Sequence, residues 1–288
     1  MRIVAVIPTL NAHETLGLLL QKLNSQSIKL DKVIVVDSSS DDDTAAIAAE
    51  SSSEVIQINR VDFNHGTTRD IVAKDQDADY VLFMTQDALP ADDQLIEKLL
   101  AGFRNENVAV SSARQLARSD ARITERLIRE YNYPDVSGIR NKDDIPKMGI
   151  KTFFVSNVCA LYDLNVFKRL DGFEHGLKTN EDMLYAAKAV NAGYSIAYCA
   201  DAVAVHSHNL SFKAQYDRNY IQGYEIARHK ELLQNVSLES EGKRLVKYVS
   251  KELLKKFKIF SFVQLGIESI YKYLGSKAGR NAGSKCQQ

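Results

Sequence analysis

The segment "KVIVVDSSSDDDTAAIAAES", which runs from Lys32 to Ser51, decides the fold of this chain. Its first six residues are largely apolar and β-branched up to Asp37, as is typical of a short buried strand. Hydroxyl and carboxylate side chains follow, and residues 42–51 have the composition of a helix. A strand without polar alternation that leads directly into a helix predicts one βα unit of a parallel sheet covered on both faces.

The same alternation of strands and helices continues on both sides of this segment. Further strands are predicted at 2–8, 54–59 and 80–85, with helices at 14–26 and 67–76. Later in the chain, 151–167 is predicted to be a strand that leads into a helix, and 179–193 a helix closed by Gly193. The last predicted strand, 194–208, ends at His206 and His208. Residues 105–150 are polar and irregular, which favours loops or an insertion. We therefore expect an α/β fold with a mostly parallel, Rossmann-like sheet, helices on both faces and a helical C-terminal extension.

Composition excludes several classes of protein. The 288 residues are 45% hydrophobic and 26% charged, which suits one large domain with a sizeable core. Cys159, Cys199 and Cys286 are scattered, so neither a disulfide framework nor a zinc site is expected, and a reducing compartment is indicated. No transmembrane helix is expected, because the sequence has no uninterrupted stretch of about 18 apolar residues. Neither a P-loop nor a G-x-G-x-x-G pattern is present.

Charge is distributed unevenly along the chain. Lys+Arg and Asp+Glu each number 37, but the segment from Lys243 to the end holds 11 basic and 2 acidic residues, which leaves 26 basic and 35 acidic residues before it. Within this tail, apolar residues recur every three or four positions beside a stripe of lysines; the first stripe is Val246, Val249, Leu253, Phe257 and Phe260, and the second is Lys247, Lys251, Lys255 and Lys258.

A basic amphipathic helix of this kind predicts binding to a membrane surface. The alternative is that the apolar stripe packs on the rest of the chain or forms a dimer contact. Nucleic acid is not expected as a partner, because the body is acidic and the tail lacks aromatic platforms for bases.

Polar residues gather where the predicted strands end. Thr9 and Asn11 follow the first strand, 37–43 the second, 64–69 the third and Asp87 the fourth. Ligands of open α/β sheets bind at the carboxyl ends of strands, so these residues predict a shared site. Read singly, each also has a structural explanation: the residues from 37 to 43 can form a turn that caps the next helix, Asp87 can cap a helix or a turn, and Arg69 can lie on the surface.

Two later motifs carry titratable groups. "TNEDM" places Glu181 and Asp182 at a helix N-terminus, with Thr179 or Asn180 as its cap. Such acids either complement the helix dipole or provide a general base. "VHSH" places His206 and His208 on one side of a strand, where imidazoles can bind a divalent metal or a phosphate, or serve the structure alone.

Together and in this order, the motifs resemble those of family 2 glycosyltransferases with the GT-A fold. The ordered set is "VIPTLN", "VVDSSSDDDT", "NHGTTRD", "TQDA", "TNEDM" and "VHSH", over about residues 2–225. "FNHGTTRD", "TQDA", "HSHN" and the C-terminal "YKYLGSKAGRN" resemble the bacterial rhamnosyltransferase branch. Proteins of that branch use dTDP-L-rhamnose to build surface polysaccharides.

The resemblance implies roles for individual residues. A nucleotide-sugar site would contain Pro8, Thr9, Asn11, Asp37, Ser40, Arg69, Gln86, Asp87 and Arg218. In it, Asp37 would bind the base, Arg69 would approach the base or diphosphate, and Gln86 would bind a sugar or ribose hydroxyl. Asn157 and Glu181 would lie on the acceptor side, and Asp182 would be the base.

A divalent metal, Mg²⁺ or Mn²⁺, is also implied, with Asp87 and His206 at its site. The family usually has D-x-D after the fourth strand, whereas this chain has Thr85, Gln86 and Asp87. The loss of the first acid removes one anionic group from the metal site, which puts strict metal dependence in question.

The implied reaction is an inverting transfer, in one displacement, to a hydroxyl of a polyprenyl-linked saccharide. This predicts a cytoplasmic protein that lies peripherally on the inner face of the cell membrane. Residues 1–235 would form the catalytic domain, with a nucleotide-sugar half at about 1–105 and an acceptor half at about 106–235, and residues 236–288 would form the tail. A homodimer is a further expectation.

Three alternatives stand beside this reading. The chain could be a non-catalytic scaffold that binds nucleotide sugars, because its D-x-D is reduced, or a transferase with another donor such as a UDP-hexose. A nucleotidyltransferase is disfavoured, because "IPTLNAHET" lacks the glycine-rich basic loop that would hold a triphosphate.

Overall fold

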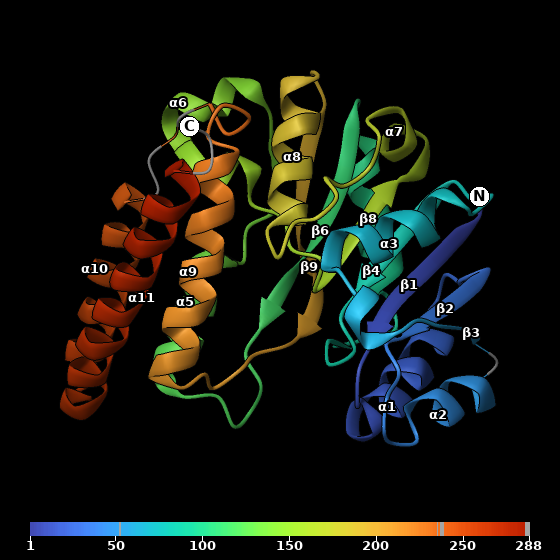
Figure 1. The fold of residues 1–288 in the computed structure, drawn as a ribbon, viewed down its shortest axis with the longest axis horizontal. Coiled ribbons are helices and arrows are strands. Elements are labelled where there is room, and N and C mark those ends of the chain that lie inside the picture. Colours follow the sequence, from blue (N-terminus) through green and yellow to red (C-terminus); the bar gives the residue numbers. More distant parts are fainter. Residues whose placement is uncertain (52, 235, 237–238, 286–288) are drawn as a thin grey trace.

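A nine-stranded sheet runs through the molecule, in the order β3–β2–β1–β4–β8–β6–β9–β5 with β7 pairing to β9 beside this path (Figure 1). The computed structural model describes residues 1–51, 53–234, 236 and 239–285. Cys286 and the position 235, at the expected domain boundary, lie outside the described residues.

Six of the nine described strands run in one direction. The strands are β1 (Ile3–Thr9), β2 (Lys32–Asp37), β3 (Glu54–Gln57), β4 (Tyr80–Met84), β5 (Leu89–Pro90), β6 (Val108–Leu116), β7 (Gly138–Arg140), β8 (Cys159–Asp163) and β9 (Ser195–Val205). Strands β8, β5 and β7 oppose the others. The mostly parallel sheet expected from the sequence is confirmed.

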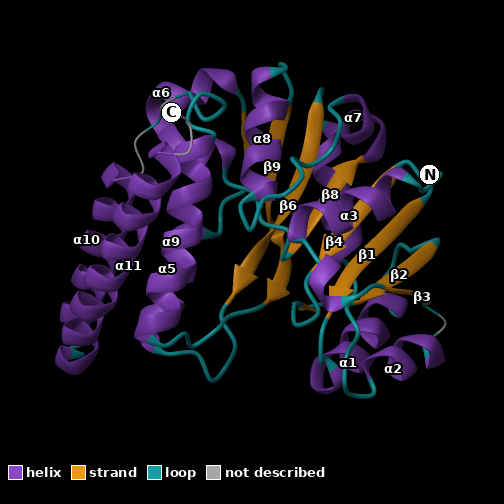
Figure 2. Cartoon of the chain, viewed as in Figure 1, coloured by secondary structure: helices purple, strands orange, loops and turns teal. Residues whose placement is uncertain are grey.

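Helices flank both faces of the sheet and extend beyond it on one side (Figure 2). They are α1 (His13–Asn24), α2 (Thr44–Glu50), α3 (His65–Lys74), α4 (Leu95–Ala101), α5 (Ile123–Asn132), α6 (Ile145–Met148), α7 (Leu164–Arg169), α8 (Glu181–Asn191), α9 (Phe212–Arg228), α10 (Glu239–Lys255) and α11 (Ile259–Lys285), with short 3₁₀ turns at Arg60–Asp62, Gly102–Arg104, Lys142–Asp144 and Gly149–Phe153.

Alternation along β1 shows why both faces are covered. Val4 and Val6 belong to a core with α3, α7 and α8, whereas Ile3, Ala5 and Ile7 belong to a second core with α1, α2 and α4. Successive side chains of a strand point to opposite faces, so a strand that is apolar at every position requires cover on both. The carboxyl ends of the parallel strands are thereby left free for a site.

The expectation of loops or an insertion from 105 to 150 is wrong where β6 and α5 form. Residues 108–116, "VAVSSARQL", form β6, which lies between β8 and β9 in the middle of the sheet. Its small and polar side chains are buried all the same: Ser111 and Gln115 are nearly inaccessible, and the hydroxyl of Ser111 lies 3.2 Å from the Cys199 sulfur. Tight packing on β9 selected these residues, so hydrophobicity did not mark the strand.

The predicted amphipathic stripe of the tail is divided between two helices. Val249 and Leu253 of α10 are buried with Leu127 of α5, as the packing alternative required. The chain then breaks at Phe257, whose φ of 52° ends the helical path, so Phe257 and Phe260 do not continue the buried stripe. A single amphipathic helix over this region is therefore wrong.

Glycines bring α9 and α11 into close parallel contact. A Cβ on Gly275, Gly279 or Gly283 would lie 2.3, 2.0 or 2.4 Å from the carbonyl oxygens of Tyr216, Tyr220 and Tyr224 respectively. The residue numbers of the contacting glycines and tyrosines increase together along the two helices, so the helices run in the same direction, as Figure 1 also shows. This contact fixes α11 against the body of the molecule.

We expect Gly279→Ala to destabilise the protein, although alanine is ordinarily the better helix former. The added methyl would collide with the Tyr220 carbonyl and force α11 away from α9, at a cost of about 1–3 kcal/mol in the free energy of unfolding. Gly266→Ala is the matched control on the same helix, where nothing lies within 4 Å of the new atom. It should be neutral or stabilising by up to about 1 kcal/mol. Urea unfolding of both variants measures this, and equal stabilities would contradict the close contact.

Candidate active site

A cavity of about 670 Å³ opens beside the carboxyl ends of β4 and β9. Seven of the residues to which the resemblance gave a role line it: Arg69, Asp87, Asn157, Glu181, Asp182, His206 and Arg218. They come from the loop after β4, the loop after β9, and helices α3, α8 and α9, with Asn157 on the segment before β8. The structure therefore gathers residues that lie up to 149 positions apart in one cavity.

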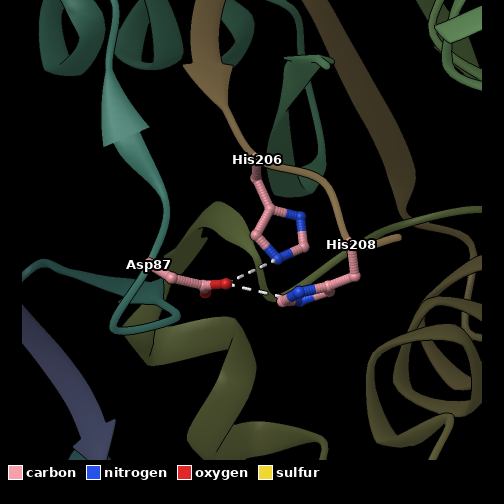
Figure 3. A group of neighbouring side chains, drawn as sticks. All are labelled: Asp87, His206 and His208. Atoms are coloured by element: carbon pink, nitrogen blue, oxygen red, sulfur yellow. Dashed lines mark ion pairs between the residues drawn. The ribbon is translucent and has the colours of Figure 1, made fainter. Parts of the chain in front are cut away.

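Asp87 and two histidines form a compact cluster in this cavity (Figure 3). The Nε2 atoms of His206 and His208 lie 3.4 and 3.3 Å from Oδ2 of Asp87. Both histidines follow β9, which ends at Val205, so the expectation that they lie on the strand is wrong. Their rings, whose centroids are 4.7 Å apart and nearly perpendicular, still converge on one carboxylate.

The chemistry of this cluster fits a divalent cation. One potential ligand atom from each residue lies within 4.8 Å of the others, and Nδ1 of His206 is buried without a hydrogen-bond partner among the described residues. Burial alone would raise the pKa of Asp87, but the hydrogen bond from His206 and the charges of both histidines lower that pKa to about 2. Burial and the neighbouring His206 lower the pKa of His208, which favours the neutral imidazole that ligates metals. His208, which the resemblance did not assign to the metal, is thus the third member.

Asp182 stands at the start of α8 with its carboxylate held in place. Its oxygens accept hydrogen bonds from the backbone N–H of Asn157 at 3.0 Å and of Met183 at 2.8 Å. Burial and the adjacent negative charge of Glu181 raise the pKa of Asp182 to about 7. A carboxyl with such a pKa is suited to accept a proton near neutral pH.

Glu181 is buried beneath Asp182 in a polar network. Its Oε1 accepts from Nδ2 of Asn157 at 3.1 Å and lies 3.4 Å from Nη1 of Arg69. Arg69 is only 2% exposed and also donates to the carbonyl of His65. Its guanidinium therefore faces Glu181 and is not free to bind a phosphate with two parallel hydrogen bonds.

The loop before α8 is tied to α3. Asn180, in the left-handed region with φ of 66°, occupies the cap position, but the expected side-chain cap from Thr179 or Asn180 is absent. Instead, the Asn64 side chain donates to the carbonyl of Leu177, and Asp70 accepts from the backbone of Phe173. These contacts hold the start of α8, where Asp182 lies.

Asp70, which ties α3 to the loop before α8, was not singled out from the sequence. It is almost fully buried, contacts Nε2 of His175 at 2.8 Å, and lies where a Cβ on Gly172 would come within 1.7 Å of its Oδ1. It belongs to the quoted "NHGTTRD" motif, but nothing in the sequence marks the loop that it contacts.

Six other predicted residues do not line this cavity: Pro8, Thr9, Asn11, Asp37, Ser40 and Gln86. Five lie at the ends of β1 and β2, and Gln86 lies in the loop after β4. They are joined to one another or to their neighbours. Asp37 accepts from the backbone N–H and hydroxyl of Ser40, and Asn11 donates its backbone N–H to the Ser40 hydroxyl. Gln86 exchanges two hydrogen bonds with the backbone of Leu10, which braces the end of β1 against the loop after β4.

The tail also contributes to the cavity wall, which the sequence did not indicate. Glu241 of α10 lines the cavity, accepts from the Tyr131 hydroxyl at 2.8 Å and pairs with Lys151 at 2.8 Å. The Lys151 ammonium lies 3.8 Å from the centroid of the Tyr131 ring. On another side, Arg218 of α9 is exposed and faces the cavity, so the C-terminal helices complete the site.

This geometry places a candidate metal cluster and a candidate base in one cavity, and comparison with known proteins identifies the family. The family model for glycosyl transferase family 2 matches residues 4–171. The chain belongs to this family. It is therefore a glycosyltransferase, and the α/β fold with a C-terminal helical region agrees with that assignment.

Two curated relatives of the family are similar over nearly their whole length. The O-antigen chain rhamnosyltransferase RfbN of Salmonella typhimurium is 38% identical over 284 residues, which cover 98% of this chain and 90% of the relative. The O-antigen chain rhamnosyltransferase WbaN of Salmonella anatum is 35% identical over 283 residues, with 96% and 88% covered.

Solved structures of lower identity share the fold. The mannosyltransferase PcManGT from Pyrobaculum calidifontis, in complex with GDP-Man and Mn²⁺, has a TM-score of 0.62 at 13% identity, over 99% of this chain and 86% of that one. TarS 1-349 of S. aureus in complex with UDP-GlcNAc has a TM-score of 0.57 at 16% identity, over 100% and 92%.

Proposed function

We propose that this glycosyltransferase moves L-rhamnose from dTDP-L-rhamnose, with inversion, to a hydroxyl of a polyprenyl-linked saccharide during synthesis of a surface polysaccharide. The observation that carries the proposal is the pairing, in one cavity, of a carboxyl poised to accept a proton, Asp182, with the cluster of Asp87, His206 and His208. The two O-antigen rhamnosyltransferases at 38% and 35% identity support rhamnose as the sugar.

Asp182 acts as the general base in the proposed reaction. Its carboxylate takes the proton of the acceptor hydroxyl, and that oxygen forms a bond to the anomeric carbon from the face opposite the nucleotide. The bond between that carbon and the diphosphate oxygen breaks, and its electron pair leaves with the diphosphate. One displacement inverts the configuration and requires no covalent intermediate.

A positive side chain favours the leaving diphosphate. Arg218 is exposed and lines the cavity, so it can donate to phosphate oxygens that gain charge in the transition state. Asp87, His206 and His208 would hold the divalent cation, Mg²⁺ or Mn²⁺. When bound, the cation supplies Lewis-acid stabilisation of the phosphate oxygens.

The nucleotide binds, in this proposal, at the ends of β1 and β2. Asp37 recognises the base, and Pro8, Thr9, Asn11 and Ser40 line the pocket around it. Gln86 uses its oxygen and one N–H on Leu10, so its second N–H remains for a ribose or sugar hydroxyl. Arg69 acts indirectly, because its positive charge pairs with Glu181, the residue next to the general base Asp182.

The acceptor enters on the side of Asn157 and Glu181, where α9 and α10 complete the wall. The proposed division is a catalytic domain at 1–235, with halves at about 1–105 and 106–235, and a tail at 236–288 that contributes Glu241 to the site. In this proposal the lipid-linked acceptor places the reaction at a membrane surface, and the nucleotide-sugar donor places it on the cytoplasmic side.

A panel of nucleotide sugars tests the donor. In calorimetry with Mn²⁺ present, we expect dTDP-L-rhamnose to bind at least about tenfold more tightly than UDP-glucose, because a polar site rejects analogues that leave its groups unpaired. Tighter binding of UDP-glucose would refute the rhamnose assignment and leave the family standing. Binding without transfer or hydrolysis of any donor would favour a non-catalytic scaffold.

A further inference from the structure

The outer face of α11 is apolar along four turns. From Ile259 to Leu274 the sequence holds two charged residues, Glu268 and Lys272. Glu268 is buried, and burial lowers the pKa of Lys272, which lies near Glu268 and Glu125 of α5. Both charges therefore face the body of the protein, and the solvent side is left to uncharged residues.

Large apolar side chains cover that solvent side. Phe260 is 93% exposed, Ile259 67% and Ile270 59%. The same face carries Phe262, Val263, Ile267, Tyr271, Tyr273 and Leu274, and Leu254 and Phe257 extend it around the corner from α10. Sixteen helical residues span about 24 Å. The exposed apolar side chains therefore form one continuous surface, unlike the isolated exposed leucines of ordinary proteins, and a continuous apolar surface marks a docking site.

Cations surround this apolar face. Lys251, Lys256 and Lys258 are exposed at the end of α10 and the corner, and Lys277 is exposed beyond the last apolar turn. Among the side chains described from 240 to 285, the acids do not offset them: Glu241 is paired with Lys151, Glu252 is paired with Lys255, and Glu268 is buried. The rim of the face is therefore positively charged.

The charge decides what covers the face. In a symmetric dimer the same surface of both copies would meet, and the lysine rims would be brought together without acids to pair with them. An anionic bilayer surface instead attracts the lysines while its acyl region receives the phenylalanines and isoleucines. Among the described helices, none is long and apolar enough to cross a membrane, so α11 would lie along the surface.

We propose that the outer face of α11, with the α10–α11 corner, docks on the surface of an anionic lipid bilayer. The inference deepens the proposed function, on which its biological role rests, by naming the surface that meets the membrane. It also replaces the stripe expected from the sequence, since Val249 and Leu253 of that stripe are buried inside the protein. Since α10 carries Glu241 in the cavity wall and ends at this corner, docking and acceptor site belong to one pair of helices (Figure 1).

Flotation of the full chain with lipid vesicles tests the proposal. We expect the protein to float with phosphatidylcholine vesicles that contain phosphatidylglycerol, and less with phosphatidylcholine alone or at high salt. Phe260→Glu combined with Ile270→Glu should weaken binding at least tenfold, by about the amount that two buried apolar side chains contribute. Lys256→Gln combined with Lys258→Gln should weaken binding to the vesicles that contain phosphatidylglycerol and leave binding to phosphatidylcholine vesicles unchanged. Val136→Glu, a comparable change at an exposed apolar residue that is not part of α10 or α11, is the matched control and should bind normally.

Two results would overturn the proposal. One is equal flotation of the wild type and the Phe260→Glu, Ile270→Glu variant. The other is a wild type that does not float but is a dimer by light scattering, with the same variant monomeric, which would make α11 a contact between two copies. Unchanged thermal unfolding of the variant shows that it is folded.

Flotation requires neither nucleotide sugar nor acceptor, so its outcome is independent of the transfer reaction. If the protein floats but transfers no sugar, the proposed function fails and the docking surface stands. If it transfers rhamnose to a soluble saccharide but does not float, the docking surface fails and the function stands.

Discussion

We expect Asp182→Asn to lower the rate of sugar transfer by about a hundred- to ten-thousandfold, the range that a positioned general base contributes. Asparagine preserves the size of the side chain but cannot take the proton of the acceptor hydroxyl. Of the two backbone N–H groups that donate to Asp182, one can still donate to the asparagine oxygen and so helps to hold the replacement in position. Turnover with dTDP-L-rhamnose and a saccharide acceptor is the measurement.

Donor binding separates this result from a loss of structure. Asp182 is not a member of the cluster proposed to hold the cation, so the dissociation constant for the donor should change by less than about threefold. Asp217→Asn, an exposed acid of α9 paired with Lys213, is the matched control and should transfer sugar at the wild-type rate. Full turnover by Asp182→Asn with every donor would exclude the proposed base.

The pH profile gives an independent view of the same group. Burial and the charge of Glu181 raise the pKa of Asp182 to about 7, and only its deprotonated form acts as a base. The kcat/KM should therefore fall as the pH decreases through about 7, and Asp182→Asn should lose this limb. Because the folded-state pKa is raised, the contribution of Asp182 to stability is fully present below about pH 4 and is lost as the pH rises through 7.

We expect Asp87→Ala to weaken metal binding by at least about a hundredfold and to reduce turnover by a similar factor. Loss of an outer-shell partner alone costs ten- to a hundredfold, and Asp87 is the carboxylate at the centre of the described cluster. Because Thr85 stands where the family usually has an acid, no second carboxylate of that motif compensates. Titration with Mn²⁺ and transfer assays with and without a chelator measure both effects.

His208→Ala examines the cluster further. His208 lies 3.3 Å from Asp87 but is more exposed than His206, so its loss should weaken Mn²⁺ binding less than the loss of Asp87 does. Asp201→Ala, an exposed acid on β9, should leave metal binding unchanged. Mn²⁺ affinity that is the same in Asp87→Ala and the wild type would show that the metal site lies elsewhere.

Local pattern determined most of the first hundred residues of this protein. Strands β1 to β4 lie where runs such as "KVIVVD" predict them, because a strand buried on both faces needs apolar residues at every position. A second rule predicted that Asp87 and the histidines would lie close together, because the carboxyl ends of parallel strands share one edge of the sheet. Two acids at a helix start suggest either dipole complementation or a general base, and only the resemblance to the family favoured Asp182 as the base.

Tertiary packing decided the rest. Strand β6 is buried with serine and glutamine because it lies between β8 and β9 in the middle of the sheet, and no periodicity of the sequence reveals that position. Arg69 turns toward Glu181, 112 positions away, which spacing along the chain cannot indicate. In the tail, the sequence by itself determined that apolar and basic residues alternate at helical spacing. Which apolar residues face inward depended on where α9 and α5 lie, because a helix has the same periodicity whichever side its partner covers.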